Sequence, residues 1–283
     1  MNMMPKMHKT PVKLINNNRT KIVDVEKIVE VEVEKITGPK ISVVMAYYNR
    51  KHQTLVTLDG FEELYAKKYN FEVIIVDDNS DLNNTLEQDI KKYSFSINLI
   101  VISKEKKGDR VNPGIAYNRG FEQAKGEIII IQNPECFHID NIFEDCLKNL
   151  SFNQMISYSC YGMNSFIDNN LIKNKESLID IIYKQNILGG ADKTCEVNVG
   201  GWLNDKNINP TYYHYCTAIF KKNLNTLGGF SVDFRNGFCY DDDEFVRRAY
   251  YQKLDLVISD KLVIHQFHES SSLPVDVKKN VIF

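Results

Sequence analysis

Largely apolar runs alternate with helix-like segments over residues 41–150, and this alternation constrains the fold more than any other feature. The runs are Ile41–Tyr47, Phe71–Val76, Ile97–Ile102 and Glu127–Ile131. Strands covered by helices on both faces carry such runs, whereas half-exposed strands alternate apolar with polar residues. The order strand, helix, strand predicts right-handed crossovers in a parallel sheet. We therefore expect an α/β fold with a Rossmann-like, mostly parallel central sheet and helices on both faces.

Helical spacing and capping signals predict the segments that connect these strands. Apolar residues recur at helical spacing over Leu55–Tyr65, and Asn112 with Pro113 indicates a cap and first turn of a helix to about Lys125. A third, capped helix is expected over Asp140–Leu150. After residue 150 the pattern predicts strands at Met155–Tyr161, His214–Phe220 and Leu262–Ile264, and helices at Ser177–Ile187 and from Asp241.

The first 38 residues differ from the rest of the chain. Ile22, Val25, Val29 and Ile36 form a helical stripe, whereas residues 29–33 alternate like a strand. We expect an N-terminal linker or a short segment that forms homo-oligomers over residues 1–38. One domain should then span residues 39–272, with one half at 39–140 and a second half at 141–272. Residues 273–283 are expected to be a peripheral tail.

Composition excludes several classes of protein. The net charge of −2 does not suit bulk nucleic-acid binding. Six scattered cysteines without a Cys-x-x-Cys pair argue against a structural zinc site and for reduced thiols. No apolar run approaches the roughly 20 residues of a membrane helix, and no signal-peptide core is visible. We therefore expect a cytoplasmic protein without a transmembrane segment.

Polar residues follow the first two strands, at the edge where such sheets bind ligands. In Ala46-Tyr-Tyr-Asn-Arg50, an aromatic side chain such as Tyr48 can stack a base that neighbouring groups hold. Asp78, in Val76-Asp-Asp-Asn-Ser80, offers a carboxylate to a ribose hydroxyl or a base N–H. The alternative for both segments is an ordinary turn into the next helix.

Two further segments offer groups for a diphosphate and its cation. Arg110 can pair with a diphosphate through both guanidinium donors, and Asn112 and Asn118 can face the same side of the following helix. The alternative is a capped helix with a surface arginine. Asn133 and Glu135 follow the fourth strand and carry oxygen donors suited to a hard divalent cation, unless Asn133-Pro134 simply makes a turn.

The last candidate groups lie in the C-terminal third. His265 and His268 follow the last strand and are either metal ligands or structural histidines. Four successive acids begin the helix at Asp241; its dipole favours one or two of them, so another is available as a general base. Trp202, the only tryptophan, either stacks on a sugar or packs in the core.

Taken in this order, the segments resemble the GT-A glycosyltransferases, especially the inverting family 2, over about residues 41–268. Ile41–Arg50 is similar to the family's opening strand, and Val76–Ser80 to its Val-Asp-Asp-x-Ser turn. Asn112–Gly120 with Ala124–Glu127 resembles the helix and lead-in to the metal strand. Residues 218–222 and 227–234 resemble a segment of galactosyl- and N-acetylgalactosaminyl-transferring relatives.

The resemblance implies roles for individual residues. Tyr48 would pack on uracil, and Asp78 would contact the base or ribose. Asp242 would be the catalytic base and Asp241 an acceptor contact, while His265 or His268 matches a metal-ligand histidine of some relatives. The sequence departs from the family's Asp-x-Asp, because Asn133-Pro134-Glu135 keeps only one carboxylate.

The expected function is transfer of a sugar from a nucleoside-diphosphate sugar, UDP-linked, to a glycan acceptor hydroxyl with inversion, in glycan or polysaccharide biosynthesis. Asp242 would act as general base, and Mn²⁺ or Mg²⁺ would bind the diphosphate. The alternative is a catalytically weak relative that only binds nucleotides or carbohydrates, which Asn133 motivates. A Rossmann oxidoreductase would carry Gly-x-Gly-x-x-Gly after the first strand, and a sugar nucleotidyltransferase a Gly- and Lys/Arg-rich loop there. Neither is present.

Overall fold

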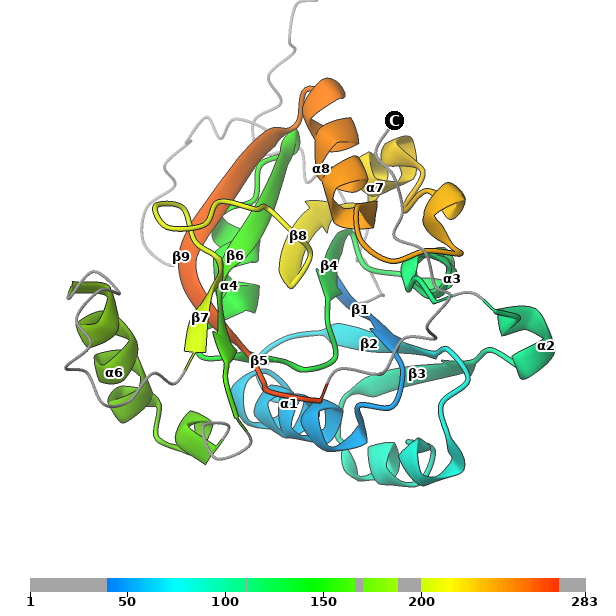
Figure 1. The fold of residues 1–283 in the computed structure, drawn as a ribbon, viewed down its shortest axis with the longest axis horizontal. Coiled ribbons are helices and arrows are strands. Elements are labelled where there is room, and N and C mark those ends of the chain that lie inside the picture. The colour runs from blue at the N-terminus through cyan, green and yellow to red at the C-terminus, as the bar shows by residue number, and fades with distance from the viewer. Residues whose placement is uncertain (1–39, 110, 166–169, 188–199, 270–283) are drawn as a thin grey trace, which may run out of the picture. The chain divides into compact units, whose positions relative to one another are not determined.

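The computed structural model describes residues 40–109, 111–165, 170–187 and 200–269. Nine strands form one mixed sheet in the order β3-β2-β1-β4-β8-β6-β9-β5, and β7 pairs with β6 off this path (Figure 1). The strands are β1 (Ile41–Tyr47), β2 (Phe71–Asp77), β3 (Ser96–Val101), β4 (Ile128–Gln132), β5 (Cys136–His138), β6 (Gln154–Met163), β7 (Gly200–Asn204), β8 (Cys216–Phe220) and β9 (Asp255–His265). The helices are α1 (Lys51–Leu64), α2 (Lys104–Lys107), α3 (Gly114–Gln123), α4 (Ile142–Asn149), α6 (Lys175–Ile187), α7 (Lys221–Leu227) and α8 (Asp241–Tyr251).

The first four strands form the predicted parallel half of the sheet. Strand β1 pairs with β2 on one side and β4 on the other, and β2 pairs with β3. Every residue of β2 and β4 is buried, as their continuous apolar sequences predict. The carboxyl ends of these four strands therefore share one edge, where the candidate ligand-binding loops begin.

The second half of the sheet is mixed, which the sequence did not indicate. Strand β8 is antiparallel to both β4 and β6, and β5 is antiparallel to β9. Strand β9 begins at Asp255, well before the predicted Leu262, and β8 begins at Cys216 rather than at His214. The early part of β9 was missed because it is largely exposed and carries polar residues.

Strands β5 and β7 were not predicted. Strand β5 has only three residues, too few for a periodic pattern. Strand β7 begins at Gly200, in a glycine-rich stretch that disfavours strands. A Cβ atom on Gly200 would lie 1.9 Å from the carbonyl oxygen of Gly162 in β6, so this close pairing requires glycine.

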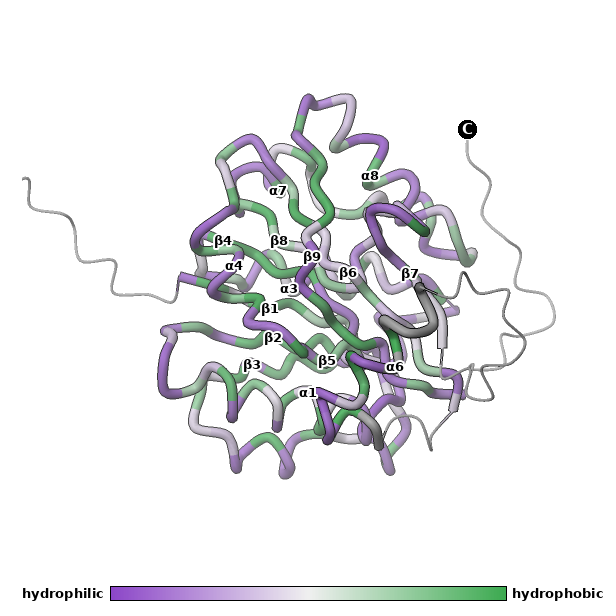
Figure 2. Tube along the Cα trace, turned by 90° about the vertical axis from the view of Figure 1, so that its left-hand side faces the viewer, coloured by the Kyte–Doolittle hydropathy of each residue, from purple (hydrophilic) through white to green (hydrophobic). Residues whose placement is uncertain are grey.

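Helices cover both faces of the sheet, as predicted. One face packs against α1 and α4 around Phe61 and Phe143, and the other packs against α3, α7 and α8 around Phe121 and Phe245. A third cluster joins α6 to β5, β6 and β9. In Figure 2 the central strands are mostly green, which marks hydrophobic residues, and the connections are mostly purple, which marks hydrophilic ones. This layered burial explains the apolar runs of the central strands.

Two helices begin one or two residues later than predicted. Helix α3 begins at Gly114, and the Asn112 side chain still accepts a hydrogen bond from the Gly114 N–H at 2.8 Å. Helix α4 begins at Ile142, where Asn141 rather than Asp140 supplies the cap by accepting from the Glu144 N–H. Both helices thus begin slightly later than the sequence pattern indicated.

Several predictions concern parts of the chain outside the described residues. These are the N-terminal segment over residues 1–38, the tail over 273–283, and Arg110. Five of the six cysteines are described; all five are free thiols, and only Cys239 is exposed. Among the described helices, none has the length and apolar character needed to cross a membrane.

Candidate active site

The candidate residues at the ends of β1, β2 and β4 come together because these strands are neighbours. Tyr48 follows β1, Asp78 follows β2, and Asn133 and Glu135 follow β4. Strand β1 lies between the other two and runs parallel to both, so their carboxyl ends meet at one edge (Figure 1). The sheet topology thus places residues from three distant segments around one region.

A lysine that the sequence did not indicate joins Tyr48 to Asp78. The Lys107 Nζ lies 3.6 Å from the centroid of the Tyr48 ring, which is 40% exposed. The same Nζ donates a hydrogen bond to the Asp78 carbonyl oxygen at 2.7 Å and lies 3.6 Å from the Asp78 Oδ2. No spacing within Lys104-Glu-Lys-Lys107 distinguishes Lys107 from its neighbours.

The two adjacent aspartates after β2 have different surroundings. Asp77 makes the turn, since its Oδ1 accepts a hydrogen bond from the Ser80 N–H at 2.8 Å. Burial is the main cause that raises the pKa of Asp77. Asp78 is also buried and pairs with Lys107. In the preceding loop, Ala46 is half-buried in β1, and the half-buried Arg50 donates to the Asn49 carbonyl oxygen.

Glu135, His265 and His268 form the one group of metal-ligand type found among the described residues. The Nε2 atoms of His265 and His268 lie 3.2 Å and 3.3 Å from the Glu135 Oε1. The antiparallel pairing of β5 with β9 places Cys136 opposite His265, which brings the preceding Glu135 to the end of β9. The three side chains predicted as metal ligands therefore converge.

Gln266 fixes this arrangement, and no sequence pattern indicated this role. Its backbone N–H donates to the Glu135 carbonyl oxygen at 3.1 Å, and its side-chain Nε2 donates to the same oxygen at 3.0 Å. The Nε2 also donates to the Gln53 carbonyl oxygen of α1. A buried glutamine between two histidines thus holds the end of β9 against the loop that carries Glu135.

The electrostatics of this cluster fit a divalent cation. Burial alone would raise the pKa of Glu135, but hydrogen bonds and charge from His265 and His268 outweigh it and hold the pKa well below its usual range. The Glu135 Oε2 is buried and has no hydrogen-bond partner in the described structure. A buried, unsatisfied carboxylate oxygen beside two imidazoles is a donor set that divalent metals bind.

Asn133 turns away from this cluster. Its Oδ1 accepts a hydrogen bond from the Tyr117 hydroxyl at 2.9 Å, and its backbone N–H donates to the Tyr215 carbonyl oxygen. Tyr117 is fully buried, and its hydroxyl also donates to the Gln132 carbonyl oxygen. The neutral side chain of Asn133 thus accepts a hydrogen bond from Tyr117 of α3, whereas the two histidines lie beside Glu135.

The four acids that begin α8 each have a different partner. Asp241 is buried and accepts a hydrogen bond from the Asn112 side chain; burial and then the charge of Asp242 raise its pKa. Asp243 accepts from the Tyr213 hydroxyl at 2.7 Å. Glu244 forms a two-pronged pair with Arg248, with both distances 2.6 Å. Arg248 in turn donates to the Gly229 carbonyl oxygen at 2.8 Å, which ties α8 to the preceding loop.

Asp242 pairs with His214, a residue the sequence analysis did not single out. The His214 Nδ1 contacts the Asp242 Oδ1, and the His214 backbone N–H lies 3.4 Å from the same oxygen. The imidazole is buried, with ring centroids 5.0 Å from Tyr117 and 4.8 Å from Phe230. A lone histidine before an apolar run carries no sequence signal for such a pairing.

Tyr117 connects the two acidic groups. Burial is the main cause that raises its pKa, followed by the charges of Glu135 and, more weakly, Asp242 and Asp241. Glu135 and Asp242 therefore both act electrostatically on this one buried hydroxyl.

Asn118 and Trp202, two further predicted site residues, make contacts with other parts of the protein. The Asn118 Nδ2 donates to the Phe230 carbonyl oxygen and its Oδ1 accepts from the Phe230 N–H, both at 2.8 Å. Trp202 is half-buried and packs edge-on against Tyr161 at 5.3 Å between centroids. Both residues have packing functions, and their contacts with donor or acceptor stay predictions.

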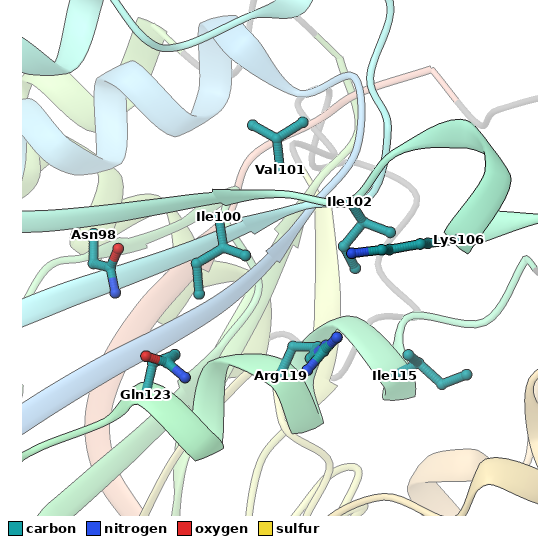
Figure 3. Close-up of a pocket in the computed structure, with 8 residues that line it drawn as sticks. All are labelled: Asn98, Ile100, Val101, Ile102, Lys106, Ile115, Arg119 and Gln123. Carbon is teal, nitrogen blue, oxygen red and sulfur yellow. The ribbon is translucent and has the colours of Figure 1, made fainter.

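Two surface hollows accompany the site. One of about 470 Å³ lies beside the start of α8 and is lined by residues 210–213 together with Asp243, Val246, Arg247, Tyr250 and Leu256. Another, of about 690 Å³, lies between β3 and α3, with Ile100 and Val101 on the strand and Arg119 and Gln123 on the helix (Figure 3). No predicted site residue lines this second hollow, so only the first adjoins the candidate active site.

Comparisons with known structures agree with this architecture. The S. aureus TarS 1–349 in complex with UDP is 17% identical, with a TM-score of 0.55 over 81% of this chain and 60% of that one. GalNAc-T7 with UDP, GalNAc and Mn²⁺ is 13% identical, with a TM-score of 0.56 over 82% of this chain and 44% of that one. The chain thus spans less than two thirds of either protein. At such low identity these likenesses concern the fold alone, and they confirm the predicted GT-A fold.

The sequence itself carries the family assignment. No curated protein matches the chain. The profile of Glycosyl transferase family 2 matches residues 42–254, which is most of the chain and contains β1, the Asp77-Asp78 turn, Glu135 and the start of α8. The chain therefore belongs to glycosyl transferase family 2, as the order of its motifs predicted.

Proposed function

We propose that this protein transfers a sugar from a UDP-linked donor to a hydroxyl group of a glycan acceptor with inversion of the anomeric centre. Residues 39–140 would bind the nucleotide and residues 141–272 the acceptor. Family membership supports the reaction class. The exposed Tyr48 ring beside the Asp78 carboxylate supports the nucleotide assignment, because a base can stack on the ring while the carboxylate accepts from ribose or base.

The observation that carries this proposal is that two acidic groups from distant segments, Glu135 and Asp242, both act on the buried hydroxyl of Tyr117. Glu135, with His265 and His268, provides the metal site, and Asp242 provides a carboxylate for proton transfer. The acceptor oxygen would attack the anomeric carbon while its proton passes to Asp242 and the bond to the diphosphate breaks. The diphosphate leaves with the bonding electron pair. A single displacement of this kind inverts the anomeric centre.

A divalent cation fits the Glu135 cluster and would supply positive charge to the leaving diphosphate. Glu135 would contribute a carboxylate oxygen, and His265 and His268 one imidazole nitrogen each. Imidazole ligands suit Mn²⁺ better than Mg²⁺, which prefers oxygen donors. The solved structure of GalNAc-T7 is a complex with UDP, GalNAc and Mn²⁺. We therefore propose Mn²⁺ as the preferred ion here.

The acceptor would approach beside α8. Asp241 is next to the proposed base, and the adjoining hollow carries aromatic and charged side chains that can hold a sugar, including Tyr213 and Tyr250. Trp202 is a further proposed acceptor contact through the exposed part of its ring. Arg50, Ala46, Asn112, Asn118 and Asn133 remain proposed contacts of the donor.

The experiment that tests the function is turnover of a panel of nucleotide sugars with Mn²⁺, with Mg²⁺ and with a chelator. Release of the nucleoside diphosphate is measured without acceptor and with a panel of oligosaccharides. We expect release from a UDP-sugar that depends on Mn²⁺. Nucleotide binding by calorimetry without any turnover would instead indicate a binding protein, and turnover of only a guanosine-linked donor would contradict the UDP assignment.

A further inference from the structure

His214 lies at the junction of the two parts of the proposed active site. It precedes β8 and points its Nδ1 at the Asp242 Oδ1. Two groups of His214 contact the Asp242 carboxylate: the side-chain Nδ1 and the backbone N–H. Both contact the same oxygen, Oδ1. No hydrogen bond or ion pair to the second oxygen, Oδ2, is found among the described residues. A carboxylate held by one oxygen has a defined orientation, which a general base needs.

The surroundings of His214 leave its imidazole little freedom. Its side chain is 9% exposed, and the rings of Tyr117 and Phe230 lie against it edge-on. The buried Nδ1 has no hydrogen-bond partner other than the Asp242 carboxylate in the described structure. Because a carboxylate only accepts hydrogen bonds, the geometry places a proton on this nitrogen.

We propose that His214 is a positioning residue for Asp242, which fixes the orientation of the carboxylate through an ion pair between its imidazolium and the Asp242 Oδ1. The proposal rests on the proposed function, since Asp242 is a base only if sugar transfer occurs. In that step the acceptor proton passes to the free oxygen of Asp242, and His214 neither gains nor loses a proton. The histidine acts through the aspartate and does not touch the substrate.

The charges around His214 agree with a protonated ring. Burial acts to lower its pKa, but three carboxylates outweigh burial and raise it. Two of these, Asp242 and Asp241, lie on α8, and the third, Glu135, lies beyond the end of β4. Tyr117, from α3, is the titratable group on the remaining side, and its own pKa is raised, so it stays neutral. No cation from these elements opposes the protonation of His214.

Two substitutions separate the shape, the hydrogen bond and the charge of His214. His214→Phe preserves the aromatic contacts with Tyr117 and Phe230 but removes both the donor and the charge. His214→Asn places an amide donor near the position of Nδ1 and removes the charge together with the aromatic contacts. Thermal denaturation and UDP titration of both variants show whether the fold and the donor site are intact.

Turnover of the donor is then measured as a function of pH at saturating Mn²⁺. We expect His214→Phe to lower kcat by roughly tenfold to hundredfold, part of the 10²- to 10⁴-fold that a general base contributes, with KM for the donor nearly unchanged. His214→Asn should recover most of this loss near neutral pH. In the wild type, kcat should fall as pH rises through the raised pKa of His214, because the imidazole loses its charge, and this fall should be absent from both variants. Wild-type kcat in His214→Phe, with the pH profile of the wild type, would overturn the proposal.

A spectroscopic readout does not depend on turnover. The imidazole ¹⁵N resonances of His214, assigned by their absence in His214→Asn, report its protonation as pH changes. We expect a pKa above that of free histidine in the wild type and a clear decrease in Asp242→Asn. An identical titration in the two proteins would contradict the pairing. If the wild type turns over no donor, the proposed function fails, whereas unchanged kinetics of His214→Phe in an active enzyme removes only the role of His214.

Discussion

The His265 Nε2 lies 3.2 Å from the Glu135 Oε1, although the two residues belong to opposite halves of the chain. The pairing of β5 with β9 creates this contact, because Cys136 and His265 are opposite each other in the register. His268 reaches the same oxygen from the following turn. A carboxylate and two imidazoles from two strand ends therefore replace the pair of acids that this family usually carries after the fourth predicted strand.

Removing the charge of Glu135 should abolish metal binding. In Glu135→Gln we expect the thermal stabilisation by Mn²⁺ to disappear, because the remaining neutral amide and two histidines bind the ion weakly. Differential scanning fluorimetry with and without Mn²⁺ measures this. Glu144→Gln, which alters an exposed acid of α4 paired with Lys148, is the control and should keep the wild-type shift. If Mn²⁺ stabilised Glu135→Gln as much as the wild type, the ion would bind at another site.

The lowered pKa of Glu135 also predicts how stability depends on pH in the metal-free protein. The folded state binds this proton less readily than the unfolded state, whose carboxyl titrates near the ordinary value of 4.5. The stabilisation is thus fully present above that value and is lost as pH falls below it toward the lower folded pKa. The free energy of unfolding from urea titrations should fall more steeply below pH 4.5 in the wild type than in Glu135→Gln. Parallel curves would show that the histidine pairs contribute nothing.

Asp242→Asn tests the proposed general base. We expect turnover to fall at least about 10²-fold while the Kd for UDP stays within twofold, because a base contributes roughly 10² to 10⁴ in rate and does not bind the nucleotide. Stopped assays of UDP release and calorimetry measure the two quantities. Asp243→Asn is the matched control on the next residue, whose carboxylate accepts from Tyr213. If both variants lose activity equally, the acidic start of α8 matters as a whole and Asp242 has no special role.

Two substitutions near the proposed nucleotide site should change UDP binding in opposite directions. Tyr48→Ala should weaken UDP binding by roughly fivefold or more, since stacking of a base on an aromatic ring contributes about 1–3 kcal/mol in single-stranded nucleic-acid complexes. Lys107→Met should strengthen it, because the ammonium that covers the ring at 3.6 Å is removed. Calorimetry with UDP and with uridine measures both effects. Weaker binding in Lys107→Met would mean that the lysine holds the nucleotide instead of competing with it.

Local sequence patterns predicted the parallel half of the sheet because three of its strands, β1, β2 and β4, are buried on both faces, although β3 is partly exposed. The runs of β1, β2 and β4 contain this information within a few residues each. The mixed half depends on contacts between distant segments: β8 enters between β4 and β6, and β5 pairs with β9. Neither pairing leaves a periodic pattern in one strand alone, so the sequence predicted the elements without their order.

The same distinction separates the site residues that were predicted from those that were missed. Glu135, His265, His268 and Asp242 stand out because charged or imidazole groups directly follow a strand or begin a helix. His214, Lys107 and Gln266 act through tertiary contacts with Asp242, Asp78 and Glu135. Each is a single polar residue in a segment without a distinctive pattern, and only the folded chain reveals its partner.

Substitution of Asn118 tests whether this polar residue of the family motif stabilises the fold or binds the donor. Its amide makes both hydrogen bonds to the backbone of Phe230, and a Cβ on the neighbouring Gly229 would lie 2.3 Å from the Asn118 Oδ1. Asn118→Ala should cost about 1–3 kcal/mol of unfolding free energy, because it leaves buried backbone groups without partners. Urea denaturation measures this loss, and UDP calorimetry decides the role: an unchanged Kd assigns Asn118 to the fold, whereas a weaker Kd in a protein of normal stability restores it as a donor contact.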